Sequence, residues 1–522
     1  MHDLPAYEEL QGSLSKRARV GQLFMPAAFI NDSEADKNAL EELIRTHHIG
    51  GLCFFHSRAS AAANFEGKKK VAYHADSLGR LKELIKRYQE AASYPLLIAM
   101  DAEWGLAMRV ENTPQYPYAG TLGALKGASE ALVYEVGLSI ARDCREAGVH
   151  WNFSPVVDIN TNPENPVIGF RAFGNDPDNV LRKARQMLRG LTDGGVISCL
   201  KHFPGHGDTA VDSHLALPVL RKSLESLEAT ELIPFRELIR EGAPAVMTGH
   251  LAVPALDASG LPASLSKTTI DLLRESMGFQ GVVVTDALNM HALRGLHQST
   301  VQINLQAHLA GNDLLCFADR IPESIDLILS GTEDKRLEAS FKRIWQLKER
   351  VFNPARPPEQ PALSGKDLNR SLARHCLVQI GDLTQSLQSF RKEGFSTLYC
   401  GQRPGAFLKG IATGQEMEWS PDLELPPSGN VLFALIPPSA KPGENFGLEP
   451  AALQAIGELA SNIRVILYLF GNPYLLRHLP LSLFKGVVCA FQPLPAFQDA
   501  AAAHFLGQIQ AEGELSIDLE YG

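Results

Sequence analysis

One fourteen-residue stretch carries the densest set of chemically active side chains in the sequence. Residues 201–214 read KHFPGHGDTAVDSH, with three histidines, two aspartates and a lysine, and they follow the apolar run 196–200 directly. Because Pro204, Gly205 and Gly207 are incompatible with a regular helix, we expect these side chains on an irregular loop that a rigid strand holds in place. Catalytic groups are commonly mounted in this way.

Two kinds of chemistry fit this set of residues. Imidazole and carboxylate groups are the usual ligands of zinc or iron, so a metal site is one interpretation. His202 and His206 have the spacing of helical metal ligands, but the proline and glycines between them remove the helix that this spacing requires. The sequence therefore favours hydrogen bonding and proton transfer, and we expect neither a metal nor another cofactor.

The stretch resembles a signature of glycoside hydrolase family 3, in the branch of β-N-acetylglucosaminidases that carry KHFPGHGDTxxDSH. In that branch the closing Asp-x-His pair, here Asp212 and His214, is the general acid/base dyad, with the aspartate orienting the imidazole. The segment VVVTDALNM at 282–290 resembles a second signature of the family. The resemblance implies that the aspartate after this strand, Asp286, is the catalytic nucleophile.

These assignments are consistent with the chemistry of a retaining glycosidase. Such an enzyme needs one carboxylate to attack the anomeric carbon and one proton donor for the leaving oxygen, with the two about 5 Å apart. Asp286 and His214 can fill these roles, since an imidazole with an ordinary pKa of about 6.5 gives and takes a proton near neutral pH. Asp212 would fix the imidazole tautomer.

Two further segments resemble sugar-binding elements of the family. IAMDAEWGLAMR at 98–109 is similar to the element D-x-E-G-G-R-V-x-R, which implies that Asp101 and Arg109 bind the sugar. Trp104 stands where the family has glycine and Leu106 where it has arginine, so the middle of the element does not carry over. Trp104 is either a core residue or a stacking platform for a sugar ring.

The second of these segments is IGFRAFG at 168–174, which resembles the family's G-x-R-S-F-G loop. The resemblance implies that Arg171 contacts the substrate. Lys201 and His202, at the start of the first signature, complete the set of residues expected to hold the non-reducing sugar.

The pattern of the first two-thirds of the chain predicts a TIM (β/α)8 barrel. Eight apolar runs alternate with amphipathic stretches over roughly 330 residues, and this fold takes about 250 before loop insertions. We expect strands at 21–25, 49–55, 96–100, 151–157, 196–200, 245–249, 282–285 and 313–317, and helices at 33–47, 178–192, 223–240 and 267–277. Polar residues follow several of these strands, as the fold requires of its active site: Asp101, Asp158, Lys201, His202, His250 and Asp286. Any single one, Asp158 especially, could instead be a structural helix cap.

A proline-rich segment, FNPARPPEQP at 352–361, marks a domain boundary. We expect a catalytic barrel over 1–352, a linker over 353–365 and a smaller three-layer α/β domain over 366–522. The expected strands of this domain are 376–380, 396–400, 431–436, 465–470 and 487–491, and its helices 450–460 and 496–508. It contains no glycine-rich phosphate loop and no nucleophile elbow.

Composition indicates a globular enzyme. The 522 residues are 45% hydrophobic and carry a net charge of −10, which argues against nucleic-acid and anionic-membrane partners. Seven cysteines without paired spacing indicate buried thiols of a reducing compartment. With no signal peptide or transmembrane run, we expect a cytoplasmic location, and an exported mature form is the alternative.

The sequence as a whole predicts a retaining exo-β-N-acetylglucosaminidase that uses no metal. By resemblance its substrate would be terminal GlcNAc in chitooligosaccharides or in peptidoglycan fragments, which makes a small carbohydrate its partner. Three alternatives stay open: a β-glucosidase or β-xylosidase of the same family, a β-N-acetylglucosaminide phosphorylase, and a catalytically silent sugar-binding protein. The phosphorylase is considered because a deprotonated imidazole repels an incoming phosphate less than a carboxylate does.

Overall fold

The chain is an α/β protein built on parallel sheets, and its residues pack into two compact units. The computed structural model describes residues 4–10, 14–56, 73–211, 217–294, 299–412, 416–423 and 429–519. Unit 1 comprises Met1–Tyr116, Tyr134–Ile159 and Ala184–Ala362, and unit 2 comprises Pro117–Val133, Asn160–Lys183 and Leu363–Gly522. Unit 2 therefore includes two segments from the first 183 residues of the chain. The domain limits given above stay a prediction.

The strands of unit 1 are short, and all their pairings are parallel. Sheet neighbours are β2-β3-β4-β5, β6-β7-β8 and β1-β9. Isolated bridges add the pairs Trp151 with Ile197, Val156 with Lys201, and Val284 with Leu314. The strands in chain order are β1 Phe24–Met25, β2 Ala27–Phe29, β3 Gly51–Phe55, β4 Leu97–Met100, β5 Trp151–Asn152, β6 Leu200–Phe203, β7 Ala245–Thr248, β8 Val282–Thr285 and β9 Leu315–Cys316.

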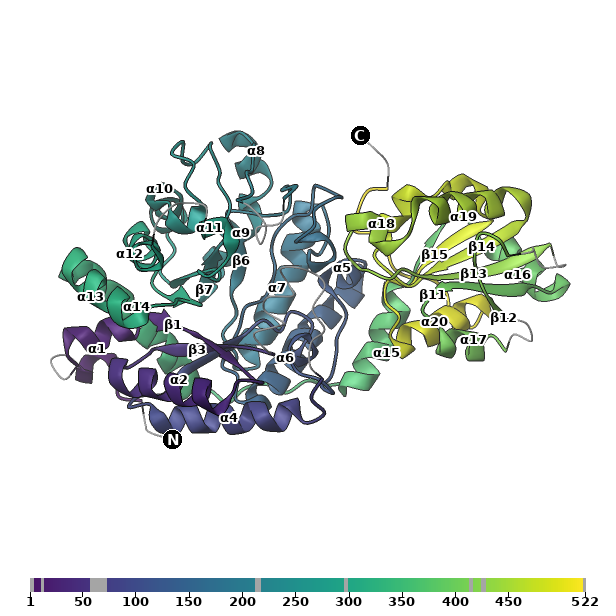
Figure 1. Cartoon of the computed structure of the whole chain (residues 1–522). Coiled ribbons are helices and arrows are strands. Elements are labelled where there is room, and N and C mark those ends of the chain that lie inside the picture. The colour runs from purple at the N-terminus through teal and green to yellow at the C-terminus, as the bar shows by residue number, and fades with distance from the viewer. Residues whose placement is uncertain are drawn as a thin grey trace. The chain divides into compact units, whose positions relative to one another are not determined.

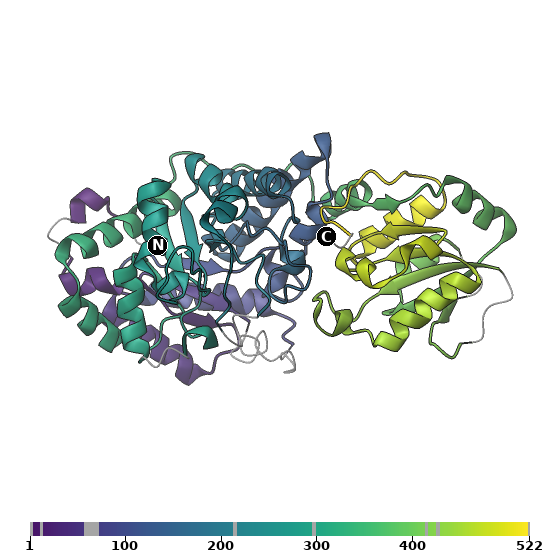
Figure 2. The ribbon, with the colours of Figure 1, turned by 90° about the horizontal axis from the view of Figure 1, so that it is seen from above.

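Helices follow most of these strands along the chain, and Figures 1 and 2 show them on the outside of the strands of unit 1. The predicted helix at 33–47 is confirmed, because Ser33 caps α2 by accepting a hydrogen bond from the Asp36 N–H at 3.2 Å. No helix in the described ranges is long and apolar enough to cross a membrane. The helices are α1 Lys16–Gly21, α2 Glu34–His47, α4 Ser77–Ala91, α6 Leu132–Ala147, α7 Pro177–Asp193, α8 Leu224–Ala229, α9 Leu232–Arg240, α10 Lys267–Asp271, α11 His291–Arg294, α12 Thr300–Ala310, α13 Ile321–Gly331 and α14 Asp334–Phe352.

Several predicted strands of unit 1 were wrong in their limits, and the runs 151–157 and 313–317 contain only the two-residue strands β5 and β9. The run 196–200 was expected to end before Lys201, but β6 is Leu200–Phe203, so Lys201 and His202 lie in the strand and not on a loop after it. They occupy buried strand positions because each has an acidic partner. Gly21, expected to begin a strand, ends α1, and the first strand starts at Phe24.

Unit 2 contains a six-stranded sheet of order β10-β15-β14-β13-β11-β12, in which only the β10–β15 pair is antiparallel. One face packs α16, α17 and α20 against alternate strand residues such as Leu432 and Ala434, and Figure 1 shows α19 on the other face. The strands are β10 Val378–Ile380, β11 Ser396–Gly401, β12 Glu416–Glu418, β13 Asn430–Ile436, β14 Arg464–Leu469 and β15 Gly486–Cys489. The helices are α5 Ala119–Leu122, α15 Gly365–Cys376, α16 Thr384–Glu393, α17 Gly405–Gly410, α18 Gly443–Gly447, α19 Pro450–Asn462 and α20 Pro495–Phe505.

Candidate functional site

A cluster of two carboxylates and two cations in unit 1 joins the loop after β4 to Lys201 within β6. Asp101 is the first residue after β4, and its two oxygens accept from Lys201 Nζ at 2.8 Å and Arg109 Nη2 at 3.0 Å. The same Lys201 Nζ lies 2.7 Å from Glu103 Oε1. The structure thus brings together three of the predicted sugar-binding residues, Asp101, Arg109 and Lys201.

The electrostatics of this cluster keep Asp101 ionised. Burial alone would raise the pKa of Asp101, but the charges and hydrogen bonds of Lys201 and Arg109 lower it well below its ordinary value. The Lys201 side chain is only 2% exposed, whereas 18% of the Asp101 side chain stays exposed. A rigid carboxylate with an accessible edge is suited to accept hydrogen bonds from sugar hydroxyls.

The guanidinium of Arg109 is held by an aromatic ring as well as by Asp101. Its carbon lies 3.8 Å from the centroid of the Phe55 ring, at the carboxyl end of β3. Such a cation–π contact contributes roughly 0.5–2 kcal/mol depending on desolvation. Arg109 is therefore fixed in place from two sides.

His202 is oriented by a buried aspartate that follows β5 in the chain. Its Nδ1 lies 2.7 Å from Asp158 Oδ2, and Asp158 Oδ1 accepts from the backbone N–H of His202 at 3.1 Å and of His206 at 2.7 Å. Burial would raise the pKa of Asp158, but the charge and hydrogen bond of His202 lower it. Asp158 thus orients the His202 ring and also binds the backbone that follows, and no helix begins at Asp158 in the described chain.

Asp286 is the first residue after β8, and its backbone N–H donates to the Thr248 carbonyl at 3.0 Å. Burial raises the pKa of the Cys199 thiol, and the negative charges of Asp101 and Asp286 raise it further. A hydrogen bond with Cys53 raises the pKa of Cys316, as do burial and the same two carboxylates. Asp286 and Asp101 therefore lie within electrostatic reach of the same two buried thiols.

Three residues of this region were not assigned a functional role from the sequence. Glu103 pairs with Lys201, Asp158 orients His202, and His206 is buried with its Nδ1 2.7 Å from Thr209 Oγ1. Burial lowers the pKa of His206 to about 4, with His202 lowering it further and Asp158 and Asp286 opposing. Glu103 could have been found, because the family element quoted above carries a glutamate at this position.

The predicted acid/base dyad, Asp212 and His214, lies outside the described residues. The described part of its segment ends just before it, and there Asp208 Oδ2 lies 3.3 Å from Lys222 Nζ. Lys222 in turn donates to the buried Glu231 at 2.5 Å.

Arg171 belongs to unit 2, where it ends the 3-10 turn η4 (Gly169–Arg171). Its Nη1 donates to the Val167 carbonyl at 3.2 Å, and its side chain is half-buried.

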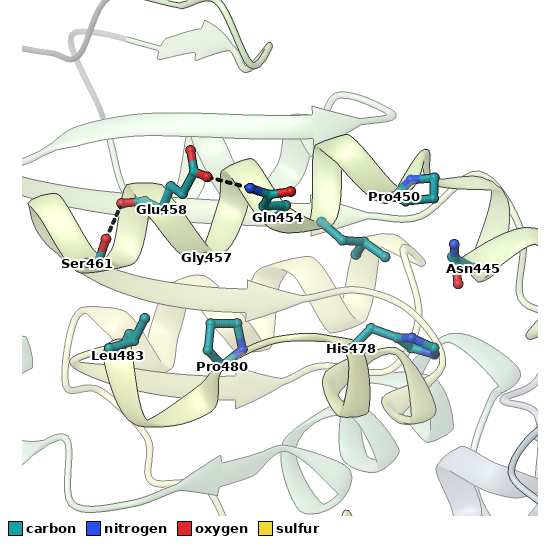
Figure 3. Close-up of a pocket in the computed structure, with 10 residues that line it drawn as sticks. Asn445, Pro450, Gln454, Gly457, Glu458, Ser461, His478, Pro480 and Leu483 are labelled. Atoms are coloured by element: carbon teal, nitrogen blue, oxygen red, sulfur yellow. Dashed lines mark hydrogen bonds between the residues drawn. The ribbon is translucent and has the colours of Figure 1, made fainter.

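Unit 2 also has a hollow of about 540 Å³ along α19, beside the 3-10 turns η7 (Pro473–His478) and η8 (Leu481–Leu483). Figure 3 shows Gln454 bonded to Glu458, and the Gln454 amide donates to that carboxylate at 2.8 Å. The hollow presents only this one carboxylate and His478 as titratable groups, so its described lining does not form a pair of carboxylates for glycoside chemistry.

A comparison with known families shows the family of the chain. The family described as "Glycosyl hydrolase family 3 N terminal domain" matches residues 15–347. The chain belongs to glycosyl hydrolase family 3. A curated relative, "Beta-hexosaminidase A" of Pseudoalteromonas piscicida, is 32% identical over 305 residues, which cover 55% of this chain and 49% of that protein. The match therefore spans about half the length of this relative. A "Beta-hexosaminidase" of Neisseria meningitidis serogroup C is 36% identical over 259 residues, covering 48% of this chain and 70% of that protein.

Two solved structures resemble nearly the whole chain. The structure of a family 3 beta-N-acetylglucosaminidase from Paenibacillus sp. str. FPU-7 is similar with a TM-score of 0.78 and 28% identity, over 97% of this chain and 99% of that one. A structure described as the beta-glucoside phosphorylase BglX bound to 2FGlc reaches a TM-score of 0.80 at 21% identity, over 99% and 97% of the two chains. At that identity the likeness concerns the fold alone.

Proposed function

We propose that the chain is a retaining exo-β-N-acetylglucosaminidase that acts without a metal. The observation that carries the proposal is geometric: Asp101, held by Lys201 and Arg109, directly follows β4, and Asp286 directly follows β8. The names of its relatives support hexosaminide substrates. Terminal GlcNAc of chitooligosaccharides or of peptidoglycan fragments is the proposed substrate, and the cytoplasm the proposed location.

The proposed scaffold is a (β/α)8 barrel with domain limits at 1–352 and 366–522. The parallel pairings and bridges run from β2 through β8 to β9, and β9 pairs with β1, which supports closure of the strands into a barrel. In that fold the residues after the strands gather at one end, as Asp101 and Asp286 would.

The proposed mechanism has two steps. In the first, Asp286 attacks the anomeric carbon while His214, oriented by Asp212, protonates the leaving oxygen, so that a glycosyl ester forms as the glycosidic bond breaks. In the second, His214 takes a proton from water, which cleaves the ester and releases the sugar. Asp101, Arg109, Arg171, Lys201 and His202 hold the non-reducing sugar.

Trapping with a 5-fluoro GlcNAc fluoride, followed by mass spectrometry, tests the nucleophile. We expect the label on Asp286, and we expect Asp286→Asn to fold and lose nearly all turnover, because an amide does not form the ester. A label on another residue would refute the assignment. A panel of p-nitrophenyl sugars with and without phosphate separates this function from the alternatives: glucoside or xyloside preference, phosphate-dependent turnover, or no turnover.

A further inference from the structure

Hydrogen bonds fix the segment that carries Asp286 after β8 ends, and one of them runs from the Ala287 N–H to the Asp286 carboxylate at 2.7 Å. The Leu288 N–H donates to the Cys316 carbonyl at 3.0 Å, and the Met290 N–H donates to the Ala287 carbonyl at 3.1 Å. The same Ala287 carbonyl lies 3.0 Å from the Nε2 of His250. A side chain from the neighbouring strand end therefore contacts the residue directly after Asp286.

His250 is itself fixed on its other side. It follows β7 in the chain and is fully buried, and its Nδ1 lies 2.7 Å from Ser264 Oγ in the 3-10 turn η5 (Ala263–Leu265). The Ser264 backbone is bound through its N–H to the Gly249 carbonyl at 3.2 Å and through its carbonyl to the Asn312 side chain at 2.8 Å. The imidazole thus connects a well-anchored turn to the Asp286 segment.

The acceptor determines the protonation of this ring. A carbonyl oxygen only accepts, so Nε2 carries a hydrogen and donates it to Ala287. With Nε2 donating to Ala287, Nδ1 accepts from the Ser264 hydroxyl, so each ring nitrogen has a hydrogen-bond partner.

We propose that His250 is a positioning residue for the nucleophile, holding the Ala287 peptide through its Nε2–H so that the Asp286 carboxylate faces the anomeric carbon. This inference rests on the proposed function, since it takes Asp286 as the nucleophile. His250 does not touch the substrate in this role. Its loss should therefore slow the attack of Asp286 and leave sugar binding unchanged.

The test separates binding from attack by inactivation with 5-fluoro GlcNAc fluoride. His250→Ala should lower kinact by about 30- to 100-fold, the size expected for a small misplacement of a reacting group, with KI within twofold of wild type. A 2,4-dinitrophenyl GlcNAc substrate should lose a similar factor in its glycosylation rate, because a good leaving group does not compensate for a misplaced nucleophile.

Two amide variants place the donor differently. His250→Gln carries an amide N–H at the reach of Nε2 and should recover kinact to within about fivefold of wild type, whereas His250→Asn carries its amide at the reach of Nδ1 and should not. If His250→Ala does not fold, the comparison of these two variants decides. His308→Ala is the matched control, because His308 is also a fully buried histidine of unit 1, on α12, with no role in this contact.

Three outcomes would overturn the inference: unchanged kinact in His250→Ala, equal defects in the Gln and Asn variants, or an equal loss in His308→Ala. Failure of the proposed function is distinguishable, since wild-type protein would then carry no label on Asp286.

Discussion

Lys348 on α14 provides a stability prediction whose size follows from its burial. Its ammonium is fully buried, donates to Gln22 Oε1 at 2.6 Å and to the Pro95 carbonyl at 2.7 Å, and has no acidic partner among the described residues. Burial lowers the pKa of Lys348 from 10.5 to about 7. Between these two values the unfolded chain holds a proton that the folded chain has released, so stability rises with pH in that window.

The full slope is about 1.4 kcal/mol for each pH unit, but at pH 7 half of the folded molecules still hold the proton, so the change between pH 7 and pH 9 is about 2 kcal/mol. Burial also lowers the pKa of Lys183, a contribution that wild type and a Lys348 variant share, whereas two buried histidines and a buried thiol change outside this interval. Burial lowers the pKa of His150 to about 4 and that of His308 to about 3, so their contributions change below pH 6.5. Burial raises the pKa of Cys144 above its ordinary 9.0, so that thiol contributes only at higher pH.

We expect Lys348→Met to remove this pH dependence. Guanidinium unfolding at pH 7, 8 and 9, followed by the fluorescence of Trp104, Trp151 and Trp345 in unit 1, measures it. The methionine also loses two hydrogen bonds, but that loss is the same at each pH. Lys335→Met, an exposed position on the same helix, is the control and should keep the wild-type slope. Parallel pH profiles for wild type and Lys348→Met would refute the reasoning.

Three further predictions concern the site. His214→Ala should lose most activity on substrates whose leaving group needs protonation and keep far more activity on a dinitrophenyl glycoside, and azide should restore its deglycosylation. Asp212→Asn should show a milder form of the same pattern. Equal losses of activity on both leaving groups would assign His214 to binding. EDTA should leave turnover unchanged, and activity lost to chelation and restored by zinc or manganese would revive the metal interpretation. Lys201→Met should reduce kcat/KM by at least 100-fold and lower stability by about 3–5 kcal/mol, because Asp101 and Glu103 lose a buried cation; a neutral effect in calorimetry and kinetics would contradict this.

Sequence patterns predicted local features of the fold well. The four β-branched residues before Asp286 predicted β8 with its observed limits, and the serine cap at Ser33 predicted the start of α2. Both signals lie within a few residues of the element that they define. Positions whose environment comes from distant parts of the chain were less predictable.

Lys201 and His202 illustrate that limit. A charged and an imidazole side chain after an apolar run indicate a loop, yet both lie in β6 and are buried. Their partners, Asp101 and Asp158, stand 100 and 44 residues away in the sequence, so no local window contains the pairs that make burial tolerable. Because of the same separation in sequence, the contact by which Asp158 orients His202 could not be predicted from the sequence.

The charges around Asp101 balance without a contribution from residue 106, where the family element has arginine and this chain has Leu106. Asp101 and Glu103 are matched by Lys201 and Arg109, two negative charges against two positive ones, with all four side chains at most 18% exposed. Leu106 is 2% exposed and begins the 3-10 turn η2 (Leu106–Met108), which ends directly before Arg109. A leucine there is consistent with a site whose cations are already sufficient to orient Asp101 toward a sugar.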